Sequence, residues 1–268
     1  MSVQAKEIWA VGDAYEAYVG RWSRLVAREF IERLGAPSGL RWLDVGCGTG
    51  ALSQTVLDRC APAALAGIDP SEGFIAHARR HTTDPRAEFR VGDARTLPVE
   101  DAAFDIAVSG LVLNFVPDPA KAVAEMTRAV RPLTGVVSAY VWDYAGEMQM
   151  MRHFWDAAVA LDPTARDKIE GSRFPLCRPE PLRDLWLGAG LGEVEVRAID
   201  APTVFRDFDD YWSPFLGGQG PAPAYCMSLP LDKRHALRER LRSTLPSKPD
   251  GSIRLIARAW AVRGKRPG

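Results

Sequence analysis

Apolar and polar positions follow two different patterns between Arg41 and about Asp143. Short apolar runs, which are typical of buried strands, are separated by segments whose apolar residues lie three and four positions apart, as in helices. The runs predict strands at 41–46, 63–69, 87–92, 104–110 and 135–142. The segments between them predict helices at 51–60, 71–81 and 118–131. Because strands that alternate with helices form parallel βαβ units, this stretch predicts a parallel sheet with helices on both faces.

The flanking segments predict further elements around this core. Helices are expected at 15–34, 146–161, 180–188 and 232–245, and strands at 194–205 and 253–262. Loop-like sequence is found at 162–179, and an insertion rich in aromatic residues, glycine and proline at 207–246. We therefore expect a single domain over 1–268, with a core at 39–143, a helical cap at 1–38 and insertions at about 144–190 and 206–250. The basic end Arg263–Arg266 is expected to be a solvated terminus.

Composition narrows the class of protein. Hydrophobic residues make up 47% of the 268 residues and charged residues 25%, as in an ordinary globular protein. Lys and Arg equal Asp and Glu at 34 each, so the zero net charge disfavours nucleic acid as a partner. The chain has no apolar run of about 18 residues, which argues against a membrane span, and Met1–Trp9 has no apolar signal core.

Cysteine and histidine usage bears on compartment and metal binding. The four cysteines are far apart and form no CxxC pair, so we expect free thiols in a reducing cytoplasm. His77 and His81 are four positions apart, but no acidic or thiol ligand motif accompanies them. We therefore expect no metal site.

The segment Arg41–Gly50 carries the chemistry of the chain. An apolar strand runs into Gly46, Gly48 and Gly50, and a predicted helix follows directly. Glycines at this spacing let the backbone turn sharply and approach a ligand closely, while the helix directs free N–H groups at it. The loop therefore predicts a nucleotide-type cofactor site. It fits both the dinucleotide pattern G-x-G-x-x-G/A and the pattern G-x-G-x-G, so the glycines leave the cofactor open.

Acidic residues near the loop discriminate between the two patterns. Asp69 closes the second predicted strand, where either pattern places a carboxylate that binds ribose hydroxyls. Asp44 is inside the strand before the glycines. A carboxylate there would repel a pyrophosphate, but it suits a ligand that carries an ammonium and a sulfonium. A third carboxylate, Asp93, follows the third predicted strand in Gly92-Asp93-Ala94.

With these residues, the stretch from about Gly39 to Trp142 resembles class I S-adenosylmethionine-dependent methyltransferases, most closely the ubiquinone/menaquinone-biosynthesis type called methyltransferase type 11. The matching motifs are Leu43–Gly50 (glycine loop), Gly67–Ser71 (ribose), Gly92–Ala94 with Leu97–Pro98 (adenine), Phe104–Val108 (fourth strand) and Met126–Pro132 (helix before strand five). The sequence departs from the family's Pro-Gly-Gly turn at Pro132-Leu133-Thr134-Gly135, far from the expected cofactor loops.

The resemblance implies an α/β fold. It is the Rossmann-like class I methyltransferase fold: a seven-stranded, mostly parallel sheet with helices on both faces, here with helical insertions after strands five and six.

The resemblance also implies S-adenosylmethionine as cofactor, with its methionyl end at the glycine loop. Gly46 and Gly48 would face the methionyl part, and Asp44 would approach its amino group. A structural cap on the glycine turn is an alternative or additional role for Asp44. Leu111, just past the fourth strand, would lie near the methionyl chain.

For the nucleoside end, the resemblance implies a second set of residues. Asp69 would bind the ribose hydroxyls, with Pro70 or Ser71 flanking the adenine. Asp93 would accept a hydrogen bond from the adenine amino group, and the N–H of Ala94 would reach a ring nitrogen.

Two residues of the N-terminal predicted helix, Tyr18 and Arg21, are expected to close the cofactor site from above. Arg21 would then pair with the cofactor carboxylate. An ordinary solvated helix face is an equally favoured interpretation of Arg21.

Methyl transfer is an in-line displacement at a carbon bonded to sulfonium, so the protein must align the acceptor, exclude water and often remove a proton. No obligatory triad is expected. Asp143, Tyr144 and His153 are weak candidates for the base, against a turn-forming Asp, a packing Tyr and an ordinary His. The tripeptide Leu113-Asn114-Phe115 also follows a strand at the edge where an acceptor would bind.

Methionine and aromatic residues are concentrated in the two insertions. They are Met148, Met150, Met151, Phe154, Trp155, Phe208, Tyr211, Trp212, Phe215 and Tyr225. For any single one, a place in a subdomain core or dimer contact is favoured over a lid. Together they favour a small, partly hydrophobic acceptor, bound by a monomer or homodimer. A non-catalytic S-adenosylmethionine-binding protein and an NAD-dependent oxidoreductase stay open as alternatives.

Overall fold

The computed structural model describes residues 20–217 and 220–268, and the chain divides into two compact units. The core unit comprises Arg24–Trp142, Pro175–Ile199 and Ala259–Gly268. The described part of the second unit comprises 20–23, 143–174, 200–217 and 220–258. The expected organisation as one domain with substrate-side insertions stays a prediction.

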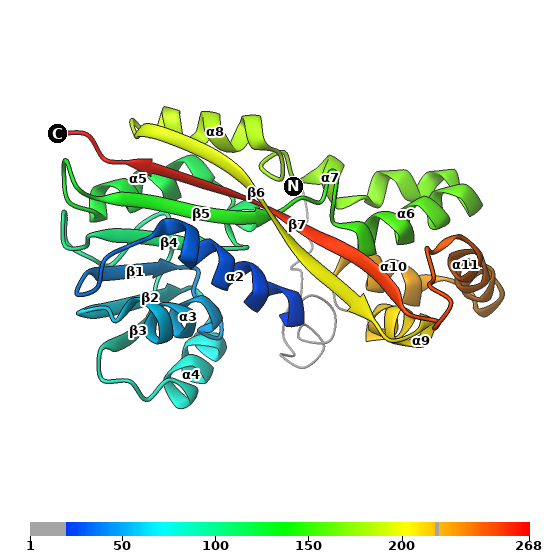
Figure 1. Ribbon diagram of the computed structural model, residues 1–268. Helices are drawn as coiled ribbons and strands as arrows, with labels where there is room; N and C mark the ends of the chain where they lie inside the picture. Colours follow the sequence, from blue (N-terminus) through cyan, green and yellow to red (C-terminus); the bar gives the residue numbers. More distant parts are fainter. Residues whose placement is uncertain (1–19, 218–219) are drawn as a thin grey trace. The chain divides into compact units, whose positions relative to one another are not determined.

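A seven-stranded sheet organises the fold (Figure 1). Its strands are β1 (Arg41–Val45), β2 (Ala64–Asp69), β3 (Ala87–Val91), β4 (Ile106–Gly110), β5 (Val136–Trp142), β6 (Gly192–Phe205) and β7 (Ile253–Lys265). The strand order is β3-β2-β1-β4-β5-β7-β6. The first five strands are parallel, and β7 pairs with β5 in the antiparallel sense. The predicted seven-stranded, mostly parallel sheet is therefore confirmed.

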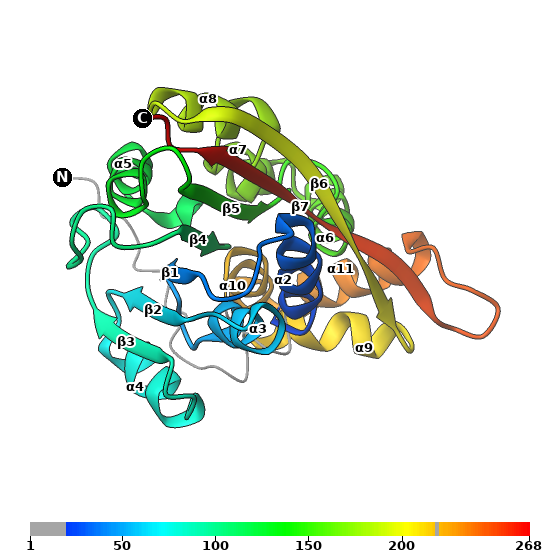
Figure 2. The ribbon, with the colours of Figure 1, turned by 60° about the vertical axis from the view of Figure 1, so that its left-hand side comes forward.

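Helices cover both faces of the sheet in the core unit. They are α2 (Arg21–Leu34), α3 (Ala51–Cys60), α4 (Glu72–His81), α5 (Pro119–Ala129) and α8 (Pro179–Gly188), with the 3-10 turn η2 at Leu113–Phe115. Figures 1 and 2 show α2 and α3 on one face, and α5 and α8 on the other. Phe30 of α2 packs on Tyr140 of β5, with ring centroids 4.7 Å apart. On the opposite face, Trp186 of α8 donates its Nε1–H to the carbonyl of Val137, 3.0 Å away.

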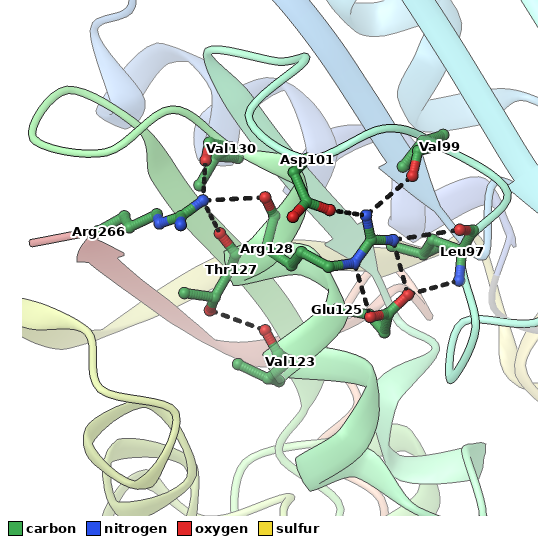
Figure 3. A network of polar contacts seen from close by, with 9 residues as sticks. All are labelled: Leu97, Val99, Asp101, Val123, Glu125, Thr127, Arg128, Val130 and Arg266. Atoms are coloured by element: carbon green, nitrogen blue, oxygen red, sulfur yellow. Dashed lines mark hydrogen bonds and ion pairs between the residues drawn. The ribbon is translucent and has the colours of Figure 1, made fainter. Parts of the chain in front are cut away.

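The basic C-terminal segment is part of the sheet and its surroundings, so the expected solvated terminus is wrong. Residues up to Lys265 belong to β7. Arg266 donates from Nη1 to the carbonyls of Thr127, Arg128 and Val130 at the end of α5, at 3.1, 2.9 and 2.6 Å (Figure 3). Since the last carbonyls of a helix lack partners within the helix, a cation there is stabilised by them.

The second unit is mainly helical. Its described helices are α6 (Gln149–Leu161), η3 (Pro163–Lys168), α7 (Glu170–Arg173), α9 (Phe208–Trp212), η4 (Ser213–Gly217), α10 (Pro221–Ser228) and α11 (Leu231–Thr244). The loop-like stretch 162–179 thus contains η3 and α7, and the insertion contains α10, whose first turn includes Pro221. No helix in the described ranges combines the length and apolar character needed to cross a bilayer.

The methionine and aromatic residues of the insertions form the interior of the second unit. All ten are buried. Phe154 stacks on Phe215 with ring centroids 4.4 Å apart, and the Tyr211 hydroxyl donates to the carbonyl of Met150 at 2.8 Å. The interpretation of these residues as a subdomain core is therefore confirmed.

Candidate functional site

The turn after β1 depends on three glycines in the left-handed backbone region. Gly46, Gly48 and Gly50 have φ of +74°, +54° and +93°. The N–H groups of Gly46 and Cys47 both donate to the carbonyl of Ile68, at 2.7 and 3.1 Å. Glycine adopts such angles without steric cost, and α3 begins directly after Gly50. The sequence therefore places its glycines where the backbone needs them.

Two of these glycines differ in their surroundings. A Cβ built on Gly46 would lie 2.5 Å from Cγ1 of Val112, whereas one built on Gly48 would meet nothing within 4 Å. Gly46 thus permits the loop to pack against the segment after β4. Gly48 borders open space that a ligand can enter.

This difference predicts unequal costs of substitution. Gly46→Ala combines the left-handed backbone cost, about 1–2 kcal/mol, with a collision against Val112, whereas Gly48→Ala carries only the backbone cost. Denaturant unfolding is expected to show a larger loss of unfolding free energy for Gly46→Ala. Equal losses of unfolding free energy in the two variants would show that the Val112 side chain moves aside without a measurable cost.

Asp44 is a fully buried carboxylate at the end of β1. Ser53 of α3 donates its hydroxyl to Oδ2 at 2.6 Å, while Oδ1 has no hydrogen-bond partner in the described part of the chain. Burial raises the pKa of Asp44 to about 7; the charge of Asp69 raises it further and the Ser53 hydrogen bond opposes the shift. A buried carboxylate with one unpaired oxygen is suited to a cationic donor, since such a donor would satisfy that oxygen.

Asp69, the last residue of β2, holds the glycine turn. Its Oδ2 accepts from the N–H of Gly48 at 3.0 Å, and its Oδ1 from the N–H of Ser71 at 2.9 Å. Burial raises its pKa, and the two backbone hydrogen bonds lower it. The structure thus brings the predicted residues Gly48, Asp69 and Ser71 together, with Pro70 between the last two. The capping role considered for Asp44 is performed here by Asp69.

Asp93 and Ala94 lie in the turn after β3. Arg95 pairs with Asp93 (Nη2–Oδ2 2.6 Å) and holds the pKa of Asp93 at about 2. The N–H of Thr96 donates to the carbonyl of Asp93 at 3.0 Å, which closes the turn. Asp93 is partly exposed and Ala94 is at the border of burial. Sequence reasoning did not single out Arg95, although an Arg two positions after an Asp often pairs with it locally.

The segment after β4 carries backbone strain and an unpaired amide. Leu111 has φ of +61°, which costs a residue with a side chain about 1–3 kcal/mol, and its N–H donates to the carbonyl of Tyr140 at 2.8 Å. Both polar atoms of the Asn114 side chain are buried, without a hydrogen-bond partner among the described residues. Strained backbone and unsatisfied polar groups are concentrated at functional sites.

Some expected site residues are not placed. Tyr18 lies outside the described residues, as does the side chain of Arg21, whose backbone begins α2. Their predicted roles stay predictions.

The three candidate bases lie in the second unit. Oδ2 of Asp143 accepts from the N–H of Glu147 at 2.9 Å, so its carboxylate stabilises the turn before α6. The ring of Tyr144 lies 6.2 Å from that of Phe174. His153 is partly buried in α6, and this burial lowers its pKa. These contacts favour the turn-forming interpretation of Asp143, while the role of each as a base stays a prediction.

Comparison with known proteins connects this geometry to a family. Residues 43–137 match the methyltransferase domain family. Residues 43–137 form a methyltransferase domain. The match agrees with the resemblance that the sequence motifs of this segment indicated. The matched segment contains the glycine loop, Asp69 and the turn that carries Asp93.

Relatives resemble parts of this chain. Demethylmenaquinone methyltransferase of Renibacterium salmoninarum is 38% identical over 112 residues, which are 42% of this chain and 44% of the relative. Trans-aconitate 2-methyltransferase of Variovorax paradoxus is 31% identical over 170 residues, or 60% of this chain and 64% of the relative. The chain therefore spans less than two thirds of each of these relatives.

A solved structure supports the fold. Phosphoethanolamine N-methyltransferase 2 of Haemonchus contortus, in complex with phosphomonomethylethanolamine and S-adenosylhomocysteine, is 17% identical with a TM-score of 0.61. The match covers 96% of this chain and 57% of that one. Such a likeness confirms the Rossmann-like methyltransferase fold expected from the sequence.

Proposed function

We propose that this protein transfers the methyl group of S-adenosylmethionine to a small, partly hydrophobic acceptor. The observation that carries the proposal is the buried carboxylate of Asp44, whose Oδ1 has no partner among the described residues, next to a glycine turn that borders open space. The cofactor supplies a methyl group bonded to a sulfonium, and the neutral thioether that forms when the methyl group is transferred is a good leaving group. Asp44 would bind its amino group, and the first N–H groups of α3 are available to its carboxylate.

The nucleoside would be held by residues that the turns after β2 and β3 bring into place. Each oxygen of Asp69 accepts one backbone hydrogen bond and keeps a further lone pair for a ribose hydroxyl. Pro70 or Ser71 would flank the adenine, and Asp93 and the N–H of Ala94 would bind its edge. The carboxylate of Asp44 disfavours a pyrophosphate, which supports this cofactor over NAD.

The acceptor would bind beyond the carboxyl ends of the strands, near Leu111 and η2. The buried amide of Asn114 offers a donor and an acceptor there, and the partly exposed Phe115 offers an apolar surface. The names of the two relatives above contain a quinone precursor and a small acid, which supports the proposal that the acceptor is a small molecule. Asp143, Tyr144 and His153 remain the proposed candidates for a base.

We further propose a cytoplasmic protein that acts as a monomer or homodimer on small molecules. Cys47, Cys60 and Cys226 form no disulfide in the described part of the chain, which supports a reducing compartment. The balance of 34 basic against 34 acidic residues supports the proposal that nucleic acid is not the substrate.

Three measurements test the proposal. Isothermal titration with S-adenosylhomocysteine should show saturable binding, and titration with NADH should show no fluorescence enhancement. S-adenosylmethionine, incubated with a panel of small phenols, carboxylic acids and amines, should be converted to S-adenosylhomocysteine only when an acceptor is present. Saturable NADH binding without S-adenosylhomocysteine binding would favour the oxidoreductase alternative; cofactor binding with no turnover across the panel would favour the non-catalytic one.

A further inference from the structure

Arg128 of α5 reaches over the segment that follows the Asp93 turn. Its Nη1 donates to the carbonyl of Val99 at 2.9 Å and pairs with Oδ1 of Asp101 at 2.6 Å. Its Nη2 donates to the carbonyl of Leu97 at 3.2 Å (Figure 3). One guanidinium therefore holds three points of the segment 97–101.

Glu125, one turn earlier in α5, completes the arrangement. It accepts two hydrogen bonds from Arg128, both at 2.8 Å, and its Oε2 also accepts from the N–H of Leu97 at 2.8 Å. The side chains of Arg128 and Glu125 are only 29% and 20% exposed, so solvent screens this bidentate pair less than it screens a surface pair. We call this pair the Glu125–Arg128 clamp.

The clamp fixes one end of the turn that carries Asp93 and Ala94. The other end is tied to β2, because the N–H of Gly92 donates to the carbonyl of Asp69 at 3.1 Å. A Cβ at Gly92 would lie 2.9 Å from Pro98, so the two ends of the turn pack closely together. Between them, the hydrogen bonds of the turn among the described residues are local, such as those of Arg95 to Asp93.

From these contacts we infer that Glu125 and Arg128 are positioning residues that set the selectivity of the cofactor site for adenine. The inference rests on the proposed function, in which Asp93 and Ala94 bind the adenine edge. Hydrogen-bond selectivity requires donor and acceptor to be held within about 0.5 Å of their productive positions, which a turn fixed only by local bonds does not ensure. The clamp supplies that constraint from a helix whose apolar face is buried.

Arg266, which follows β7, offers a control that contacts the same helix. Its guanidinium donates to three backbone carbonyls at the C-terminal end of α5 (Figure 3), whereas the guanidinium of Arg128 donates to the two backbone carbonyls of Leu97 and Val99. Arg128→Met and Arg266→Met therefore remove comparable numbers of backbone hydrogen bonds. Only the first is expected to change adenine recognition.

The experiment compares two probes by isothermal titration with the full chain: S-adenosylhomocysteine, and S-inosylhomocysteine, in which an oxo group replaces the adenine amino group. We expect the wild type to prefer the adenine probe at least about tenfold, since the inosine probe leaves Asp93 and Ala94 unmatched. Arg128→Met should weaken S-adenosylhomocysteine binding about tenfold and reduce the preference to below about threefold, which is the size of loss seen when a group that orients a binding residue is removed. Arg266→Met should lower the melting temperature but keep the preference.

Each other result contradicts the inference in a distinct way. If Arg128→Met keeps the wild-type preference for the adenine probe, the clamp has a purely structural role. The same conclusion follows if Arg266→Met loses that preference to the same extent as Arg128→Met. If the wild-type protein binds both probes equally, this turn does not select for adenine. If the wild-type protein binds neither probe, the proposed function itself is contradicted. If Arg128→Met does not fold, Arg128→Lys retains the charge but loses the bidentate geometry, and must reduce the preference in the same direction.

Discussion

Asp44→Asn is expected to make the protein more stable at pH 8 while weakening its binding of S-adenosylhomocysteine by about 10- to 100-fold. The affinity falls because the amide cannot pair with the cofactor ammonium, and a hydrogen bond to a charged group contributes about 1.5–3 kcal/mol. The stability rises because the substitution removes a buried carboxylate whose oxygen Oδ1 has no partner in the described chain.

The pH dependence follows from the raised pKa. Asp44 titrates at about 7 in the folded protein and at 3.8 in the reference state. Between these values the folded state holds more protons than the unfolded state, so the contribution of Asp44 to stability falls as pH rises from about 4 to 7. The variant should therefore melt several degrees higher than wild type at pH 8, with the difference largely gone at pH 4.

Binding should show the opposite trend in the wild type. Cofactor affinity should fall as pH decreases below about 7, because protonated Asp44 no longer attracts the ammonium. Asp44→Asn should remove this dependence. Calorimetry at pH 6 and 8, with melting curves at pH 4 and 8, checks both trends. Ser53→Ala removes the hydrogen bond that opposes the pKa shift of Asp44, so this variant should lose cofactor affinity at a higher pH than wild type. An Asp44→Asn protein that binds like wild type at pH 8 would show that Asp44 does not contact the cofactor.

Asp69→Ala is expected to lower cofactor affinity at least tenfold, or about 1.4 kcal/mol or more. Two losses add in this variant. The ribose hydroxyls lose their carboxylate, and the N–H groups of Gly48 and Ser71 lose the acceptor that connects the glycine turn to the start of α4. Isothermal titration with S-adenosylhomocysteine measures the first loss together with any displacement of the turn.

A capping carboxylate elsewhere separates these effects. Oδ1 of Asp118 accepts from the N–H of Lys121 at the start of α5, so Asp118→Ala should cost about 1 kcal/mol of stability and leave affinity unchanged. Asp69→Asn keeps an acceptor for one of the two backbone groups and should retain part of the affinity. Unchanged affinity in Asp69→Ala would remove Asp69 from the proposed ribose site.

Elements with local signals could be predicted from the sequence. β1 and the turn after it follow from an apolar run that ends at Gly46, and α5 follows from Asp118 and Pro119 before an apolar stripe. The prediction for β4 began two residues early, since Phe104 forms only an isolated bridge with Val130. The resemblance brought Gly48, Asp69 and Ser71 into one expected site, and the structure places them in contact.

Features that depend on distant partners could not be predicted. Nothing near Arg128 in the sequence indicates that it will meet Leu97 and Val99, because the β3–β4 connection and α5 meet only in the folded protein. No local signal in the sequence marks Ser53, because the Ser53 hydroxyl meets Asp44 only when α3 packs against β1. The exposed-looking end at Arg266 likewise gains its role only when β7 enters the sheet.

The position of β7 in the sheet determines which strands can pair before synthesis of the chain is complete. This strand lies between β5 and β6 in the sheet but follows both in the chain. Until the ribosome releases it, β6 lacks the neighbour with which it pairs, and β5 keeps an open edge that can pair with other chains. The five parallel strands can assemble early, whereas β6 can join the sheet only together with β7. The strand order therefore leaves the β5 edge open until β7 has been synthesised, and that edge is where incomplete chains can associate.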